Sequence, residues 1–140
     1  MKTYKLFSGV ILISIMLLYS SCAQTVKFQN SAIVPAAQGT VKVKQDANKN
    51  YRIEVNINDL ADIDRLDSSK ETYVVWMETS QGRTENIGQL RSSRGFISKQ
   101  KKASLETVSS FKPFRVFVTA EHGNNVRFPG NQVVLTTETF

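Results

Sequence analysis

The stretch from residue 73 to residue 79 constrains the fold of this chain more than any other, because it is apolar on both of its alternating faces. In an extended chain, successive side chains point to opposite sides. One side here carries Tyr73, Val75 and Met77, and the other carries Val74 and Trp76. A strand that is apolar on both sides predicts a central position in a sheet that is covered on both faces.

Other segments alternate with the same period of two and predict further strands. The clearest is 51–58, and 40–45 precedes it across the polar residues 46–50, so the two predict a hairpin. Segments near residues 84–90, 103–108, 114–121 and 133–137 complete the set, with an additional edge strand near 26–28. The acidic segment 59–72 predicts a crossover connection that can hold one helical turn. Because no long segment has a helical period, we expect an all-β, immunoglobulin-like antiparallel sandwich of seven to eight strands.

The first residues have the organisation of a secretory signal peptide. Lys2 and Lys5 precede 14 uncharged and mostly apolar residues, Leu6 to Tyr19, and small residues follow. Fourteen residues fit the core of a signal peptide and fall short of the ~20 that a spanning helix needs. We therefore expect the protein to be exported.

Two cleavage positions fit the residues that follow. Ser21-Cys22-Ala23 matches the small-x-small pattern with a cut before Gln24, which would release a soluble periplasmic or secreted protein. The segment also resembles a bacterial lipoprotein signal, although Tyr19 stands where leucine is usual. That resemblance implies a cut before Cys22 and acylation of its thiol. We favour the lipoprotein, since Cys22 is the only cysteine and a free thiol is unusual outside the cytosol.

The predicted organisation is thus a signal peptide (1–21), a tether (22–38) and one sandwich domain (39–140). Loss of residues 1–21 removes two of the eighteen basic residues and none of the twelve acids, so the formal charge falls from +6 to +4. This mild charge, in an exported protein, does not favour a nucleic-acid partner.

The residues that carry most enzymatic chemistry are scarce. The single histidine, His122, lies in the turn-rich loop 121–125, where we expect an exposed side chain and no Ser-His-Asp arrangement. The acids Asp59, Asp62, Asp64 and Asp67 lack the glycine and spacing of a calcium loop, so we expect a solvated connection and no metal or other cofactor. Trp76 is expected in the core. The sequence therefore predicts a protein that is not an enzyme.

The basic stretch 91–102 is the best candidate for a ligand-binding surface. It holds five basic residues and no acid, namely Arg91, Arg94, Lys99, Lys101 and Lys102, around the apolar pair Phe96-Ile97. Such a loop can bind an acidic glycan or an anionic lipid headgroup. The alternative is a solvated loop whose charge keeps the protein soluble.

From Tyr73 onward the chain resembles the extracytoplasmic C-terminal domain of anti-sigma-K-type factors. The residues that carry the resemblance are Tyr73-x-Val75-Trp76, Gly82, Gly88-x-Leu90, Phe114-x-Val116, Val118-Thr119-x-Glu121, Pro129-Gly130 and Val133-Val134-Leu135, with a looser match at Gly39-x-Val41 and Asn58-x-Leu60. In that family the domain is a β-sandwich, joined by a transmembrane helix to a cytoplasmic segment that holds a sigma factor. We expect neither of those parts here, so the resemblance implies the fold and a binding or sensing role, and not sigma-factor inhibition.

The expected function is a non-enzymatic lipoprotein of the bacterial cell envelope that binds another envelope protein or senses a signal there. We expect the lipid anchor at Cys22 to hold the protein at the membrane. The alternative is a binding module for an anionic glycan or lipid headgroup through the basic stretch. The sequence does not indicate the partner, the membrane or the oligomeric state.

Overall fold

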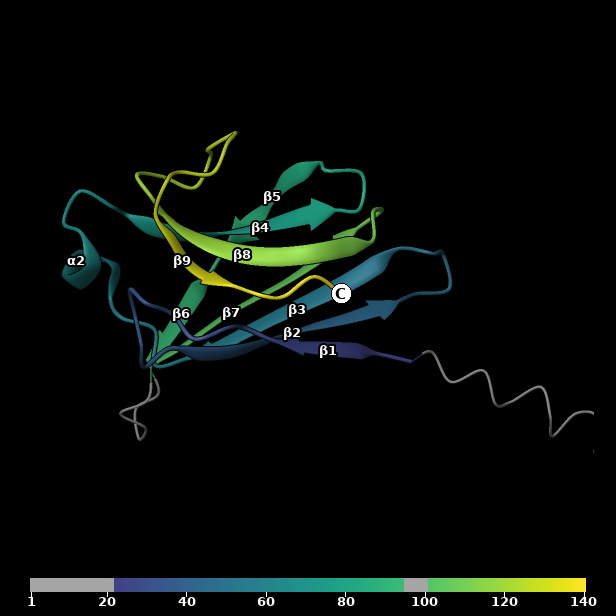
Figure 1. Cartoon of the computed structure of the whole chain (residues 1–140), viewed down its shortest axis with the longest axis horizontal. Helices are drawn as coiled ribbons and strands as arrows, with labels where there is room; N and C mark the ends of the chain where they lie inside the picture. Colours follow the sequence, from purple (N-terminus) through teal and green to yellow (C-terminus); the bar gives the residue numbers. More distant parts are fainter. Residues whose placement is uncertain (1–21, 95–100) are drawn as a thin grey trace, which may run out of the picture.

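The computed structural model describes residues 22–94 and 101–140, and within them the chain forms two antiparallel sheets that pack face to face (Figure 1). Nine strands are described: β1 (Gln24–Lys27), β2 (Gln38–Gln45), β3 (Tyr51–Asn58), β4 (Thr72–Thr79), β5 (Thr84–Gln89), β6 (Arg91–Arg94), β7 (Lys101–Ser109), β8 (Pro113–Glu121) and β9 (Val133–Thr136). One short helix, α2 (Ile63–Leu66), lies in the crossover. The order is β1-β2-β3-β7-β6 in one sheet and β5-β4-β8-β9 in the other. The predicted β-sandwich is confirmed.

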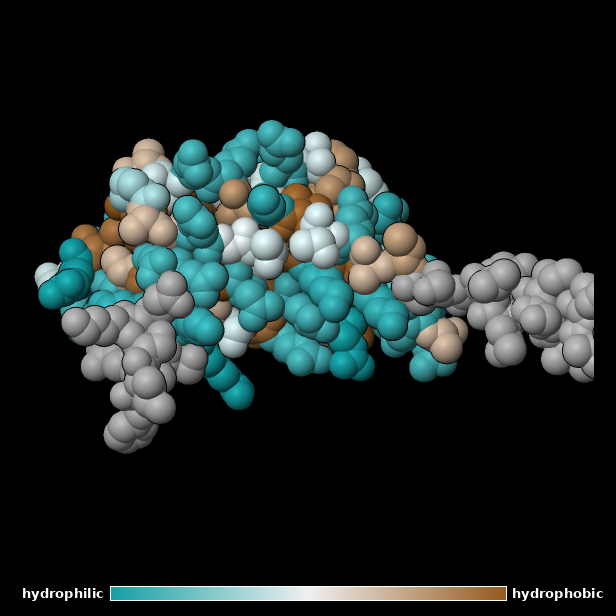
Figure 2. Space-filling view, turned by 90° about the horizontal axis from the view of Figure 1, so that it is seen from below, coloured by the Kyte–Doolittle hydropathy of each residue, from teal (hydrophilic) through white to brown (hydrophobic). Residues whose placement is uncertain are grey.

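The core lies between the sheets and follows the alternation in the sequence. Ile53, Val55 and Ile57 of β3 are at most 1% exposed and face the inner side of β4 and β8. The polar residues between them form the outer face of the five-stranded sheet, where Arg52 Nη1 donates to Glu106 Oε1 at 2.9 Å. The face that is turned to the viewer in Figure 2 is largely hydrophilic. The hairpin of β2 and β3 forms with Lys42 opposite Glu54, as the pattern predicts.

The central strand β4 is buried on both sides, as its composition predicts. Tyr73, Val75 and Met77 join the main core, whereas Val74 and Trp76 form a second cluster with Phe117 on the outer face of the sheet. The cover on that face is the loop 122–132, drawn in yellow-green above β8 in Figure 1, which packs Val126 on the cluster. Trp76 is completely buried, as expected.

The segment 22–38, expected as a tether, contributes to the sandwich along most of its length. Beyond β1, its side chains at Phe28, Ser31, Val34 and Ala37 are all at most 9% exposed. Phe28 bridges to Thr137, and Gln29 N donates to Thr136 O at 2.8 Å. This segment therefore covers the edge of β9. The three-residue spacing of these buried side chains does not match a strand, and the segment is too short and polar to predict a long helix, which is why the sequence indicated a tether.

The interpretation of 91–102 as one basic loop is wrong at both ends. Residues 91–94 form β6 and residues 101–102 begin β7, paired antiparallel across the segment 95–100, which lies outside the described residues. Arg-Ser-Ser-Arg has no apolar alternation, so it could not be recognised as a strand. It becomes one by extending the sheet from the edge of β7.

Candidate functional site

The strand pairing of β6 with β7 gathers most of the predicted basic residues at one end of the five-stranded sheet. Arg94 lies opposite Lys101, Ser93 lies opposite Lys102, and Arg91 lies opposite Ser104. Arg91 and Lys102 are exposed. Lys99 and the pair Phe96-Ile97 lie outside the described residues.

A cleft with a volume of about 250 Å³ opens beside this basic end. Its walls are the crossover after β3, the start of β4 and the start of β7; the lining residues are Leu60, Ala61, Asp62, Ile63, Asp64, Glu71, Thr72, Tyr73, Leu90, Lys101, Lys102 and Ala103. The charged lining includes three carboxylates and two ammonium groups. The mouth is therefore of mixed charge, and its floor is apolar at Leu60, which is 5% exposed.

Lys101 is engaged within the cleft. Its Nζ donates to Asp62 Oδ2 at 2.5 Å, and both side chains are a little over one third exposed. A lysine held by a carboxylate is less available to an anionic ligand than the sequence alone suggested. Asp62 is a site residue that sequence reasoning did not connect with Lys101, because 39 residues separate them.

Tyr73 fixes one wall of the cleft. Its hydroxyl donates to Ala61 O at 3.0 Å and so ties the crossover to β4. Burial, with a smaller contribution from the charge of Asp62, raises the pKa of Tyr73 to about 12. The phenol is therefore neutral and remains a hydrogen-bond donor over the physiological range.

The crossover acids do not converge on a common point. Among the residues that the structure describes, no three His, Cys, Asp or Glu side chains are grouped as metal ligands. Asp67 instead accepts hydrogen bonds from Ser69 Oγ at 2.7 Å and Ser69 N at 2.8 Å, which lower the pKa of its carboxyl. Asp62 bonds to Lys101.

His122 is exposed, as expected for the loop after β8. Its Nδ1 lies 2.6 Å from Ser69 O and its Nε2 lies 3.2 Å from Lys70 Nζ. A carbonyl oxygen only accepts, so Nδ1 carries the proton and Nε2 is free to accept from the lysine. The imidazole thus joins the end of β8 to the crossover, close to the cleft.

A buried polar chain runs across the outer face of the four-stranded sheet. Trp76 Nε1 donates to Thr119 Oγ1 at 2.7 Å, and Thr119 Oγ1 donates to Glu121 Oε1 at 2.5 Å. Gly130 N donates to the same Glu121 oxygen at 2.7 Å. Glu121 is 4% exposed. Its burial could not be recognised from the sequence, because a glutamate that alternates with apolar residues predicts a solvent-facing position.

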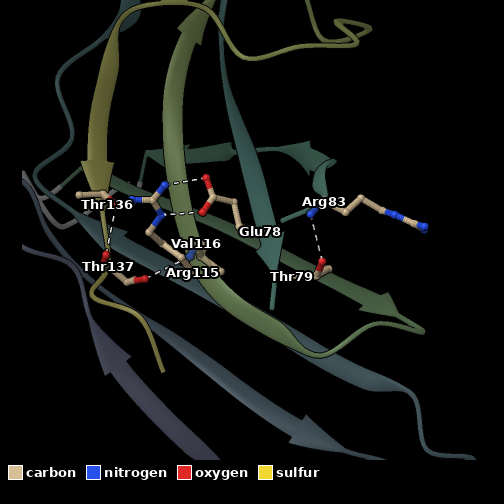
Figure 3. Close-up of polar contacts among 7 residues, drawn as sticks. All are labelled: Glu78, Thr79, Arg83, Arg115, Val116, Thr136 and Thr137. Carbon is tan, nitrogen blue, oxygen red and sulfur yellow. Dashed lines mark hydrogen bonds and ion pairs between the residues drawn. The ribbon is translucent and has the colours of Figure 1, made fainter. Parts of the chain in front are cut away.

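Farther along β8, Arg115 forms a bidentate ion pair with Glu78 of β4 (Figure 3). The distances are 2.9 Å from Nε and 2.6 Å from Nη2, and the pair raises the pKa of the guanidinium. Arg115 also borders a shallow hollow beside the loop 122–132, with Phe117, Gly130 and Val133. Because the guanidinium is already paired, this pair is best explained as a link between β4 and β8.

Cys22 lies at the other end of the molecule from the cleft. Its thiol is free and exposed, and one residue, Ala23, separates it from β1. The pairing of Gln24 with Val43 places it near the β2–β3 turn, whereas the cleft lies near the opposite ends of β3 and β7, at Asn58 and Lys102. At about 3.4 Å per residue, the eight residues of β3 separate these two ends by about 25 Å.

No helix in the described part of the chain is long and apolar enough to span a membrane. Comparisons with protein-family models, with curated proteins and with solved structures find no match for this chain. The candidate site therefore rests on its own geometry.

Proposed function

We propose that this protein is an exported, lipid-anchored and non-enzymatic β-sandwich of the bacterial cell envelope, which binds another envelope protein. The observation that carries the proposal is the mixed-charge cleft at the end of the sandwich farthest from Cys22. A lipid on Cys22 would hold the opposite end at the membrane and leave the cleft accessible to a partner.

The chemistry of the cleft favours a protein segment as its ligand. Acidic and basic side chains border an apolar floor, and a polypeptide offers charges of both signs together with apolar side chains. A purely anionic ligand would meet Asp62, Asp64 and Glu71 there. The resemblance to the extracytoplasmic domain of anti-sigma-K-type factors supports the same class of role, because it implies binding or sensing in the envelope as well as a β-sandwich.

Site-specific photo-crosslinking in living cells tests the partner. A photoreactive residue replaces Asp64 or Lys102, which are exposed and line the cleft, or Thr25, an exposed control position on β1. We expect one recurrent envelope protein to be captured from Asp64 and Lys102 but not from Thr25. Capture of lipid or glycan alone, or equal capture from all three positions, would contradict protein binding through the cleft.

The anchor is tested separately by mass spectrometry of the mature N-terminal peptide. We expect acyl chains on Cys22 and loss of membrane association in the Cys22→Ser variant. An unmodified chain that begins at Gln24 would contradict the lipoprotein assignment and would favour a soluble exported protein.

The exposed basic cluster of Arg91 and Lys102, which the antiparallel pairing of β6 with β7 places on the same face of the sheet, favours one second candidate, a binding module for an anionic ligand. The variant that tests this candidate is Arg91→Glu with Lys102→Glu. Lys101 is left unchanged, because it forms an ion pair with Asp62. Binding of a sulfated glycan through this cluster should weaken steeply with ionic strength and disappear in the variant. An apolar protein interface should depend little on salt.

A further inference from the structure

We propose that the end of the sandwich beside Cys22 is a membrane-facing surface that rests on anionic phospholipid headgroups. This end, called here the proximal end, consists of the turns 46–50, 80–83 and 109–112 together with the strand residues that border them. The inference rests on the lipid attachment at Cys22 in the proposed function, and it adds the orientation in which the protein is held.

Strand register places the three turns at one end of the molecule. Gln45 pairs with Tyr51 at the β2–β3 turn, and Tyr51 pairs with Ser109 at the start of the β7–β8 turn. In the other sheet, Thr79 pairs with Pro113, which brings the β4–β5 turn beside the β7–β8 turn. Figure 1 shows these turns together on the right, where β1 also begins.

The proximal end exposes apolar side chains. Val108, Phe111 and Phe114 are 56%, 40% and 39% exposed, and they make up half of the six large hydrophobic residues that are exposed among those described. The other three, Ile33, Phe128 and Val133, lie outside this end. Phe111 lies in a turn between two strands, with one face of its ring 4.8 Å from the guanidinium carbon of Arg83. An aromatic ring beside a cation is a combination that suits the boundary between headgroups and acyl chains.

The charges in the three turns of the proximal end are mainly positive. The three turns contain three basic residues, Lys49, Arg83 and Lys112, and a single acid, Asp46. The Asp46 carboxylate accepts hydrogen bonds from the backbone N–H groups of Asn48 and Asn50. Lys44, one residue before the end of β2, is exposed as well. Arg83 is 3.7 Å from Glu85, but no ion pair to another described residue is found for Lys44, Lys49 or Lys112. Such a surface attracts anionic lipid.

The short distance between Cys22 and the sheet brings the proximal end to the bilayer. Two residue steps join Cys22 to Gln24, which span at most about 7 Å. Strands in a sheet are about 4.8 Å apart, so β7, the third strand from β1, lies only about 14 Å across the sheet. An acylated Cys22 therefore leaves little room for the sandwich to turn away. The basic and apolar proximal end is the part that meets the headgroups.

Quenching of an introduced tryptophan by brominated lipid tests this orientation. The full chain is matured in cells, purified with its acyl chains and reconstituted into phosphatidylcholine vesicles with phosphatidylglycerol, with or without bromine on the acyl chains. Phe111→Trp reports on the proximal end. Phe128→Trp is the matched control, because Phe128 is 82% exposed and lies in the loop 122–132, on the outer face of the four-stranded sheet and away from the proximal end. Trp76 is completely buried and provides the common background.

We expect loss of the added fluorescence in Phe111→Trp and none in Phe128→Trp. Adding Lys44→Glu, Lys49→Glu and Lys112→Glu should relieve the quenching in phosphatidylglycerol vesicles, since each lysine changes the affinity for an anionic surface about fivefold. Equal quenching at both positions, or quenching that is independent of the lysines, would overturn the inference. So would a blue shift of Phe111→Trp that depends on protein concentration and not on bromine, which would indicate a protein contact at this end.

The acylation state separates this inference from the proposed function. If mass spectrometry finds no acyl chain on Cys22, the lipid anchor of the proposed function is contradicted. If the chain is acylated and Phe111→Trp is not quenched, the anchor stands and the membrane-facing end is wrong.

Discussion

Thr119 forms two buried hydrogen bonds with one hydroxyl group, so the outer face of the four-stranded sheet should be sensitive to its loss. The hydroxyl accepts from Trp76 Nε1 and donates to Glu121 Oε1. Both partners are at most 4% exposed, so neither can turn to water when the hydroxyl is lost. The indole N–H of the only tryptophan therefore depends on this hydroxyl, and the Glu121 carboxylate, which also accepts from Gly130 N, loses one donor with it.

Replacing Thr119 by valine, which keeps the shape and removes the hydroxyl, should lower the free energy of unfolding by about 2 kcal/mol, because a buried donor loses its partner. Urea denaturation followed by Trp76 fluorescence measures the change. The control is Thr84→Val, at an exposed position on β5, which we expect to stay within about 0.5 kcal/mol of the parent. Equal stability of the two variants would show that the polar chain contributes little.

At the scale of elements, the contact between β1, β2 and β3 depends on the absence of a side chain at Gly39. A Cβ built there would lie 2.6 Å from the backbone oxygen of Asn56 and 2.8 Å from Ile57 Cγ1. The backbone oxygen belongs to the neighbouring strand and cannot move alone. Phe28 Cδ2 would lie 3.0 Å from the same Cβ. The absence of a side chain at Gly39 therefore also lets the N-terminal segment pack on the sheet.

Gly39→Ala should consequently cost about 2 kcal/mol through overpacking, despite the usual preference of strands for alanine over glycine. Gly123→Ala is the matched control, since a Cβ at Gly123 would meet nothing within 4 Å. The midpoints of urea unfolding compare the two. Similar midpoints for both variants would mean that β2 can shift away from β3 at little cost.

The elements that could be predicted are those whose partners are implied by their own side chains. The hairpin of β2 and β3 and the buried strand β4 follow from local alternation, and α2 falls in the predicted crossover. β6 could not be predicted, because Arg91 to Arg94 become a strand only through pairing with β7. Likewise, the sequence singled out Lys101 and Asp62 separately but not their contact, because that contact depends on how the crossover folds back.

The whole molecule has two unlike ends, and Tyr73 connects the stability of one of them to pH. Its hydroxyl holds the crossover at the cleft, and burial raises its pKa from 10.0 to about 12. The folded protein thus binds this proton more tightly than the unfolded chain does. The stabilisation is complete below pH 10, declines as the pH rises towards 12, and is lost above that value.

We therefore expect the urea midpoint of the parent protein to fall more steeply between pH 10 and pH 12 than that of Tyr73→Phe. At lower pH the variant should be less stable by about 1 kcal/mol, because it lacks the hydrogen bond to Ala61 O. All other ionisable groups are common to both proteins, so the difference in slope isolates Tyr73. Parallel curves would contradict a raised pKa.

The contact between the N-terminal segment and β9 affects the order in which this chain can fold during its synthesis. Ser31 Oγ donates to Val134 O across 103 residues, and Phe28 bridges to Thr137. Synthesis proceeds from the N-terminus, so residues 28–34 are complete long before their partners exist. Closing so large a loop is slow. Until then residues 28–34 lack the partner strand that ties them to the sandwich, and a chaperone that binds the nascent chain would find its target there.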